Sequence, residues 1–153
     1  MIIDGTNGLT FNNSTTQASA GSVLQVVNAS TTSATSNSSG TPTATSLTVS
    51  ITPKFATSKI LVIATGGDLD NVAAGRQILS FLYRNTTQLN SSTTNYSAST
   101  TRIITPFALS VLDSPATTSA TSYSVYVSSG TANQVTFNSQ GGTAVITAME
   151  IAA

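Results

Sequence analysis

Histidine, cysteine and tryptophan are absent from this 153-residue chain, and charge is scarce, with five Lys or Arg and five Asp or Glu. Without histidine or cysteine the chain cannot form a Ser-His-Asp triad, a cysteine nucleophile, a zinc cluster, an iron-sulfur centre or a histidine-ligated haem. Disulfides are excluded too, so burial of apolar surface or assembly must stabilise the fold. These absences predict a protein that is not an enzyme and holds no cofactor.

The few charges produce no net electrostatic field of one sign, because the formal net charge is zero. A neutral chain is a poor match for nucleic acid or for an anionic membrane surface. The sequence contains no run of 18 apolar residues and no basic segment followed by an apolar run at the N-terminus. It therefore predicts neither a membrane-inserted segment nor a signal peptide.

Hydroxyl side chains dominate the composition, with 28 Thr and 24 Ser. Ser, Thr, Val, Ile and Asn are middling or poor helix formers, and no window repeats apolar residues with a helical period. A period of two, typical of a strand with one buried face, recurs instead. It is clear in residues 47–52 and again in residues 122–128, where Tyr126 places an aromatic ring on the polar side.

Eight segments are predicted to be strands, namely residues 22–29, 47–52, 60–64, 78–83, 107–112, 122–128, 135–137 and 144–151. Those at 60–64, 78–83 and 107–112 are apolar on both faces, which is typical of strands inside a sandwich or against another chain. Gly66-Gly67 and similar dipeptides predict turns. The pattern predicts an all-β fold, a jelly-roll-like antiparallel β-sandwich of about eight strands.

Two Ser/Thr/Asn-rich stretches, residues 30–46 and 85–100, are predicted to be long loops. The first 21 residues differ from the rest, since they contain only short apolar pieces separated by turns. They are too small to form a core, so Ile2, Ile3, Leu9 and Phe11 must pack against the main domain or against copies of the chain. We expect sister chains or a virion partner to cover them. The division is therefore an attachment or trimerisation segment, 1–21, and a sandwich domain, 22–153.

The chain opens with Asp4-Gly5-Thr6-Asn7-Gly8-Leu9-Thr10-Phe11, followed by Ser14-Thr15-Thr16-Gln17. This opening resembles the segment that precedes C-terminal domains in tail-fibre-like proteins of bacteriophages. The rest of the chain is similar to the domain itself, and Leu112-Asp113-Ser114-Pro115-Ala116 is the most specific element. The other matching stretches are Ile51-Thr52-Pro53-Lys54, Ser58-Lys59-Ile60-Leu61-Val62, Leu82-Tyr83-Arg84, Tyr123-Ser124-Val125 and Ile146-Thr147-Ala148-Met149-Glu150-Ile151.

The resemblance implies a homotrimeric β-sandwich knob that is displayed on a virion. Family members usually end a much longer fibre, whereas Met1 here begins at the linker-like segment. We therefore expect a short fibre or spike, docked on another virion protein of the capsid, tail or fibre adaptor. Its expected location is the virion surface, after synthesis in the host cytoplasm, and host-surface polysaccharide is the expected receptor.

Asp68 and Asp70 are the candidate metal ligands, because two carboxylates and nearby backbone carbonyls can bind Ca²⁺. Solvated carboxylates in a loop are the alternative. The remaining acids are scattered, which argues against the facing pair that a glycosidase needs. Asp113 is expected to accept N–H groups of a turn, and Glu150 is expected to pair with Lys or Arg.

Arg76, Arg84 and Arg102 have the fork geometry that binds acidic sugars or phosphates, with Arg76 and Arg102 as the possible receptor contacts. Salt bridges to the few carboxylates are the alternative. Tyr96, in a predicted loop, is the candidate for stacking on a sugar ring; packing against its own domain is the alternative.

Three functions stay open at this point. The first is an adhesive virion fibre whose distal loops bind the host. The second is a capsid or tail decoration protein that cements the particle and binds no receptor, and the third is a free carbohydrate-binding module.

Overall fold

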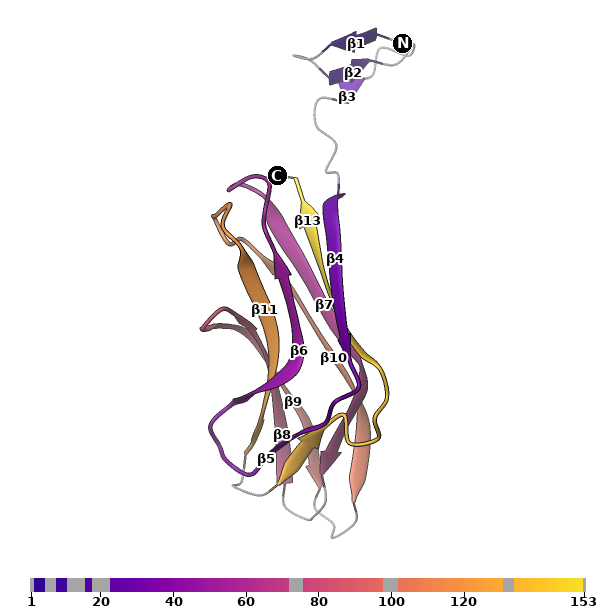
Figure 1. Cartoon of the computed structure of the whole chain (residues 1–153), viewed down its shortest axis with the longest axis vertical. Helices are drawn as coiled ribbons and strands as arrows, with labels where there is room; N and C mark the ends of the chain where they lie inside the picture. Colours follow the sequence, from indigo (N-terminus) through magenta and orange to yellow (C-terminus); the bar gives the residue numbers. More distant parts are fainter. Residues whose placement is uncertain are drawn as a thin grey trace.

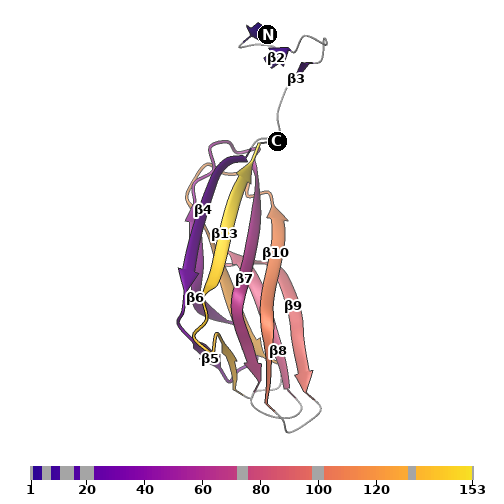
Figure 2. The same cartoon turned by 90° about the vertical axis from the view of Figure 1, so that its right-hand side faces the viewer.

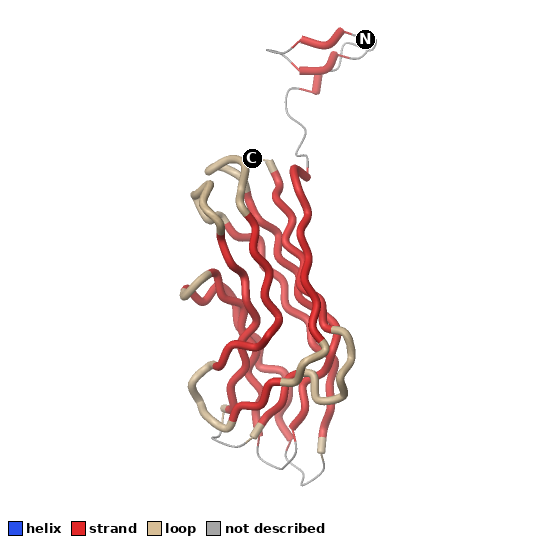
Figure 3. The backbone as a smooth tube through the Cα atoms, in the orientation of Figure 1, coloured by secondary structure: helices blue, strands red, loops and turns tan. Residues whose placement is uncertain are grey.

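The computed structural model describes residues 2–4, 8–10, 16–17, 23–71, 76–97, 102–130 and 134–152. Every regular element among these residues is a β-strand, as Figure 3 shows, and every strand pairing is antiparallel. No helix long enough to cross a membrane occurs in this part of the chain. The prediction of an all-β fold is confirmed.

Three short strands form a sheet of their own, in the order β1 (Ile2–Asp4), β2 (Gly8–Thr10) and β3 (Thr16–Gln17). Ile3 lies opposite Leu9 in this sheet. A sheet of two- and three-residue strands is too small to be stable alone. The side chains of Ile2, Ile3, Leu9 and Phe11 lie outside the described part of the structure, so their contacts stay a prediction.

The other ten strands form two facing sheets (Figure 1), which confirms the antiparallel sandwich. The larger sheet has the order β4 (Val23–Thr31), β13 (Ala144–Ile151), β7 (Lys59–Asn71), β12 (Val135–Phe137) and β5 (Thr35–Asn37), with β10 (Ile103–Asp113) also paired to β7. The smaller sheet has the order β6 (Thr43–Ile51), β11 (Thr121–Ser129), β8 (Arg76–Arg84) and β9 (Thr87–Ser97).

Two of these strands, β5 and β9, lie in stretches that the sequence predicted to be loops. The prediction of a loop over residues 85–100 is wrong, because a turn at Asn85 (φ 51°) leads directly into β9. Strand β9 is an edge strand, paired with β8 alone. It has hydroxyl and amide side chains on both faces and so lacks the apolar alternation of an interior strand.

The core lies between the two sheets and is built from their inward-facing residues. Phe107 and Phe137, both from the larger sheet, meet edge to face with ring centroids 5.5 Å apart. Each fully buried aliphatic or aromatic side chain contributes about 1.5–3 kcal/mol. The main contributors are Leu47, Val49, Ile51, Ile60, Val62, Leu69, Ile78, Leu82, Tyr123, Val125, Val127 and Ile146.

Gly66 and Gly67 form a β-bulge inside β7, not the predicted turn. Between the pairs Thr65–Ala108 and Asp68–Pro106, two residues of β7 oppose one residue of β10. Both glycines have positive φ, 81° and 67°, where L side chains are strained. The strand therefore continues through the dipeptide, and only its alternation changes.

The bulge shifts that alternation by one residue. Before it, Ile60, Val62 and Ala64 face the core; after it, Leu69 does. Asp68 and Asp70 consequently lie on the outward face of the sheet. An unshifted strand would direct both carboxylates into the core, where unpaired charge is costly.

Side-chain hydrogen bonds join the edges of the two sheets. The hydroxyls of Thr31 and Ser46 lie 2.8 Å apart and connect β4 to β6. On the opposite edge, the Asn90 amide donates to the carbonyl of Ser110 at 2.9 Å and connects β9 to β10. Such contacts occupy edges that would otherwise be open to strand pairing.

Glu150 is buried on the inward side of β13, and its partners are not the Lys or Arg that the sequence predicted. It accepts hydrogen bonds from the Gln25 amide at 2.6 Å and from the backbone N–H groups of Lys54 at 2.7 Å and Phe55 at 3.3 Å. Burial acts to raise the pKa of Glu150, but these hydrogen bonds outweigh it and hold the pKa below its usual value. The carboxylate thus fixes the turn after β6 against β4 and β13.

We expect Gly66→Ala to lower the free energy of unfolding by about 3 kcal/mol or more. A Cβ atom at this position would lie 2.5 Å from the carbonyl oxygen of Thr143, in addition to the strain of positive φ. Gly141→Ala is the matched control, because Gly141 also has a positive φ, 67°, but has no atom within 4 Å of the place that a Cβ would occupy. It should cost only about 1–2 kcal/mol. Urea unfolding that gives equal losses for the two variants would contradict the proposed role of the bulge.

Candidate functional site

The candidate metal ligands and receptor contacts lie on strands that meet at one end of the sandwich. The chain enters and leaves the sandwich at the other end, where Val23 pairs with Ile151. The end away from these residues, here called the far end, is formed by β5, β12 and the adjoining ends of β7 to β11 (Figures 1 and 2). Asp68, Asp70, Arg76, Tyr96 and Arg102 all lie in or next to the strand ends there.

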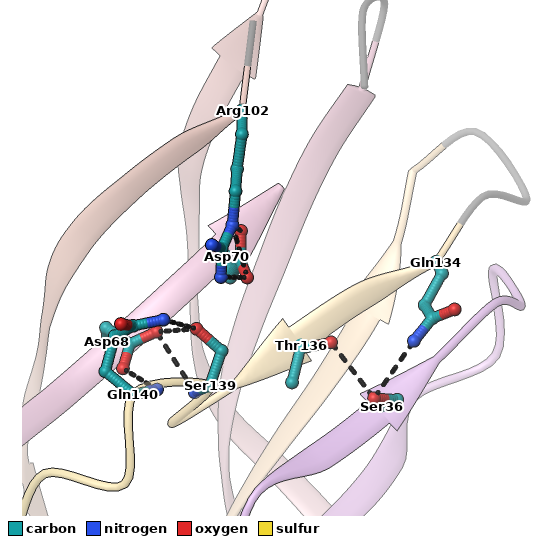
Figure 4. Close-up of polar contacts among 8 residues, drawn as sticks. All are labelled: Ser36, Asp68, Asp70, Arg102, Gln134, Thr136, Ser139 and Gln140. Carbon is teal, nitrogen blue, oxygen red and sulfur yellow. Dashed lines mark hydrogen bonds and ion pairs between the residues drawn. The ribbon is translucent and has the colours of Figure 1, made fainter. Parts of the chain in front are cut away.

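Asp70 and Arg102 form a forked ion pair at the far end (Figure 4). Nε of Arg102 donates to both carboxylate oxygens at 3.0 and 3.1 Å, and Nη2 donates to Oδ2 at 2.5 Å. The Asp70 side chain is 3% exposed and the Arg102 side chain 51% exposed. Hydrogen bonding from Arg102 lowers the pKa of Asp70 against the opposing effect of burial. Arg102 therefore forms a salt bridge to a carboxylate of the chain itself, which was the alternative to receptor binding.

Asp68 holds the connection between β12 and β13. Its carboxylate accepts hydrogen bonds from the hydroxyl of Ser139 at 2.7 Å and from the backbone N–H groups of Ser139 and Gln140 at 3.1 and 3.0 Å. Its backbone carbonyl accepts the N–H of Asn138 at 2.7 Å. Asp68 is buried, and both its carboxylate and its backbone carbonyl bind residues 138–140, so its evident role is structural.

A polar row continues from Asp70 across the neighbouring strands. Asp70 lies opposite Thr136, and Thr136 lies opposite Ser36. The hydroxyls of Ser36 and Thr136 are 3.0 Å apart, and the Gln134 amide donates to Ser36 at 3.3 Å (Figure 4). The row presents hydroxyl and amide groups to solvent.

This geometry does not favour a metal site at Asp68 and Asp70. Both carboxylates are already occupied by donors of the protein: Asp68 by the hydroxyl and backbone N–H of Ser139 and the backbone N–H of Gln140, and Asp70 by the guanidinium of Arg102. No cluster of three or more Asp, Glu, His or Cys side chains occurs in the part of the chain that the structure describes. The alternative expectation, that these are solvated carboxylates in a loop, is wrong, since both residues are buried within β7.

Arg84 is engaged inside the molecule. Its Nη1 contacts the two carboxylate oxygens of Asp113 at 2.8 and 3.0 Å, and Tyr123 donates its hydroxyl to the same carboxylate at 2.7 Å. Burial, followed by this hydrogen bond, raises the pKa of Tyr123. Asp113 belongs to the larger sheet and its two partners to the smaller one, so the group links the sheets. The expectation that Asp113 accepts turn N–H groups is wrong.

Two of the predicted receptor contacts cannot be placed by their side chains. Arg76 begins β8 opposite Ser97, and Tyr96 lies in β9 opposite Gln77, but both side chains are outside the described part of the structure. Tyr96 was a candidate because the sequence predicted it to lie in a loop. That prediction is wrong, since Tyr96 lies in strand β9.

A cluster of three aromatic residues is not among the site residues that the sequence predicted. Phe81, Tyr83 and Tyr126, here called the aromatic patch, lie on the outward side of the smaller sheet. The rings of Tyr83 and Tyr126 have centroids 4.3 Å apart, and Phe81 meets Tyr83 edge to face at 6.3 Å. The signal was present in the sequence, because Tyr126 interrupts the polar side of an alternating strand.

Hydroxyl groups border the aromatic patch. Ser124, two residues before Tyr126, lies opposite Tyr83 and bonds to the exposed hydroxyl of Thr48 at 2.6 Å. Phe81 is buried within the patch, whereas Tyr83 and Tyr126 are partly exposed. Partly exposed tyrosine rings with adjacent hydroxyls can stack on an apolar ring face and exchange hydrogen bonds with a polyol.

Comparisons with known proteins add no assignment. No protein-family model matches the chain, and no curated protein is similar to it.

We expect Ca²⁺ to leave the thermal stability of the protein unchanged, because the carboxylates of Asp68 and Asp70 are already bonded. A site with a dissociation constant near 1 mM would add about 1 kcal/mol at about 5 mM Ca²⁺, which corresponds to a rise in Tm of about 2–4 °C. Scanning calorimetry with Ca²⁺ and with EDTA measures this directly. A rise in Tm of that size that disappears in the Asp68→Asn variant would contradict this prediction and support a Ca²⁺ site at these carboxylates.

Proposed function

We propose that the chain is a non-enzymatic structural protein of a virion, a homotrimeric phage fibre or spike. In this proposal the N-terminal segment docks on another virion protein and the sandwich is displayed as a knob for adhesion to the host surface. One observation carries it: the chain enters and leaves the sandwich at the same end, beside the pair Val23–Ile151, so attachment there leaves the far end free. The resemblance to tail-fibre-like proteins supports the same function.

The chemistry of the described residues supports binding without turnover. The sequence has no histidine to titrate near neutrality. Asp68, Asp70, Asp113 and Glu150 are each held by hydrogen-bond donors of the protein itself. A carboxylate that serves as a general acid needs a raised pKa, whereas the pKa values of Asp70 and Glu150 are lowered.

Host-surface polysaccharide is the proposed ligand of the knob. Hydroxyls, amides and the partly exposed rings of Tyr83 and Tyr126 provide modest contacts to sugars, and repetition of those contacts compensates for their weakness. Three sites on a trimer, repeated over a particle, raise avidity by about 10² to 10⁴ without any new contact.

The first test places the protein on the particle. Antibody labelling of intact particles of the encoding phage should mark symmetric attachment sites. Deletion of residues 1–21 should leave a folded sandwich, by circular dichroism, that is missing from purified particles. Normal incorporation of the truncated chain would contradict docking through the N-terminal segment, and a protein found only free in the lysate would favour a carbohydrate-binding module.

The second test addresses adhesion. We expect Tyr126→Ala to reduce adsorption of whole particles about tenfold, and by more than it weakens binding of the isolated protein, because multivalency multiplies the loss. Phe55→Ala is the matched control, since Phe55 is an exposed aromatic residue outside the aromatic patch. Unchanged adsorption in particles that carry Tyr126→Ala, or lack the chain altogether, would favour decoration over adhesion. Shortening of the polysaccharide that depends on Asp68 or Asp70 would overturn the non-enzymatic assignment.

A further inference from the structure

The outward face of the larger sheet carries an apolar row near the end where the chain enters. Val26 lies opposite Met149, Met149 opposite Leu61, and Leu61 opposite Leu112. Directly opposed residues share one face of a sheet, so the four side chains cross β4, β13, β7 and β10 in a line. Figure 2 shows these four strands side by side in that order.

The two ends of the row are strongly exposed, Val26 at 54% and Leu112 at 53%. Val23, at the start of β4, is exposed to the same extent. Exposed apolar residues that form a continuous patch mark an interaction surface more often than isolated ones do.

A hollow lies next to the row on the same strands. It has a volume of about 330 Å³ and is lined by Ile63, Thr65, Ala108, Leu109 and Ser110. Ile63 is two residues from Leu61 along β7, and Ser110 is two residues from Leu112 along β10. One face therefore offers both projecting apolar side chains and a recess to receive them.

The face is almost free of charge. Among the described outward residues of β4, β13, β10 and the first part of β7, Lys59 at the margin is the charged one. Anionic polymers and charged protein surfaces find no complementary charge here. A second copy of the same face brings only the marginal Lys59 as like charge, so little electrostatic repulsion opposes contact between identical chains.

We propose that this face is the contact between copies of the chain in the homotrimer, and the inference rests on that part of the proposed function. The β4 side of one copy, with Val26, packs on the β10 side of the next, with Leu112 and the adjacent hollow. The two sides differ, so the contact is head to tail, and three such contacts close around a threefold axis.

The size of the face indicates that it does not act alone. Four strands and seven residues along each cover roughly 19 by 24 Å. A stable interface buries about 800 Å² on each partner. The N-terminal segment joins the sandwich at Val23, beside this face, and its apolar residues are suited to supply the remainder.

The test is the oligomeric state of the full chain, measured by analytical ultracentrifugation over a range of concentrations. We expect the natural chain to sediment as a trimer, and Val26→Arg and Leu112→Arg each to raise the concentration of half-dissociation about tenfold or more. Ile104→Arg is the matched control, because Ile104 is also an exposed apolar residue of β10 but lies toward the far end. It should leave the trimer intact, and circular dichroism should show all three variants folded.

Cysteine pairs provide a second measurement, since the chain has no cysteine of its own. Val26→Cys combined with Leu112→Cys should give disulfide-linked dimers and trimers under mild oxidation, whereas Phe55→Cys combined with Ile104→Cys should not. A monomeric natural chain, or a trimer indifferent to both arginine variants and without cross-links, would overturn the inference.

Other occupants of the face give different results. If the chain's own N-terminal segment covers it, deletion of residues 1–21 should promote association instead of weakening it. If a different virion protein covers it, the isolated chain should stay monomeric. Both outcomes overturn the proposed contact, and neither depends on finding the protein on a particle, so they are distinguishable from failure of the proposed function.

Discussion

The bulge at Gly66-Gly67 determines which side of the central strand faces the core, and most of the far end depends on it. The extra residue turns Leu69 inward and Asp68 and Asp70 outward within one continuous strand. It also coincides with the place where β12 stops and β13 starts on the same edge of β7, since Phe137 pairs with Leu69 and Ala144 with Gly66. The six residues between them leave the sheet at that point and are fastened by the carboxylate and carbonyl of Asp68. A side chain at either glycine would interfere with this crossing, so the local backbone freedom of glycine supports a long-range arrangement.

The scarcity of charge acts together with this arrangement. Asp68, Asp70, Asp113 and Glu150 are used inside the molecule, where they hold a turn, a cation or the contact between the sheets. The hydrogen bonds of charged groups are strong, and an unpaired buried carboxylate is costly. Each of these four carboxylates is therefore held in place by its own partners. Little charge is left for the outer surfaces, which consist of hydroxyl, amide and apolar groups. Surfaces of this kind favour association over dispersion in solution.

The two sheets present different outer faces. The larger sheet has an apolar row and a hollow, and the smaller sheet has hydroxyls around the aromatic patch. In the proposed trimer the larger sheets face one another, which turns the smaller sheets and the far ends outward. Apolar surface is then covered by copies of the chain, and the groups suited to sugar binding are repeated three times around the axis. Assembly and adhesion would thus use opposite sides of one sandwich, without competition for the same residues.

The sequence by itself determined the all-β class, eight of the ten sandwich strands and the absence of histidine and cysteine chemistry, because composition and period-two alternation are local properties of the chain. It missed β5 and β9, since edge strands with hydroxyls on both faces show no alternation. It interpreted Gly66-Gly67 as a turn, because a bulge and a turn require the same backbone freedom. The partners of the carboxylates were decided only by the tertiary structure: Arg102 is 32 residues from Asp70, and Ser139 is 71 residues from Asp68. These hydrogen bonds between residues far apart in the sequence follow from the order of the strands and from the shift of the inward–outward alternation in β7. Neither can be recognised in a short window of the sequence.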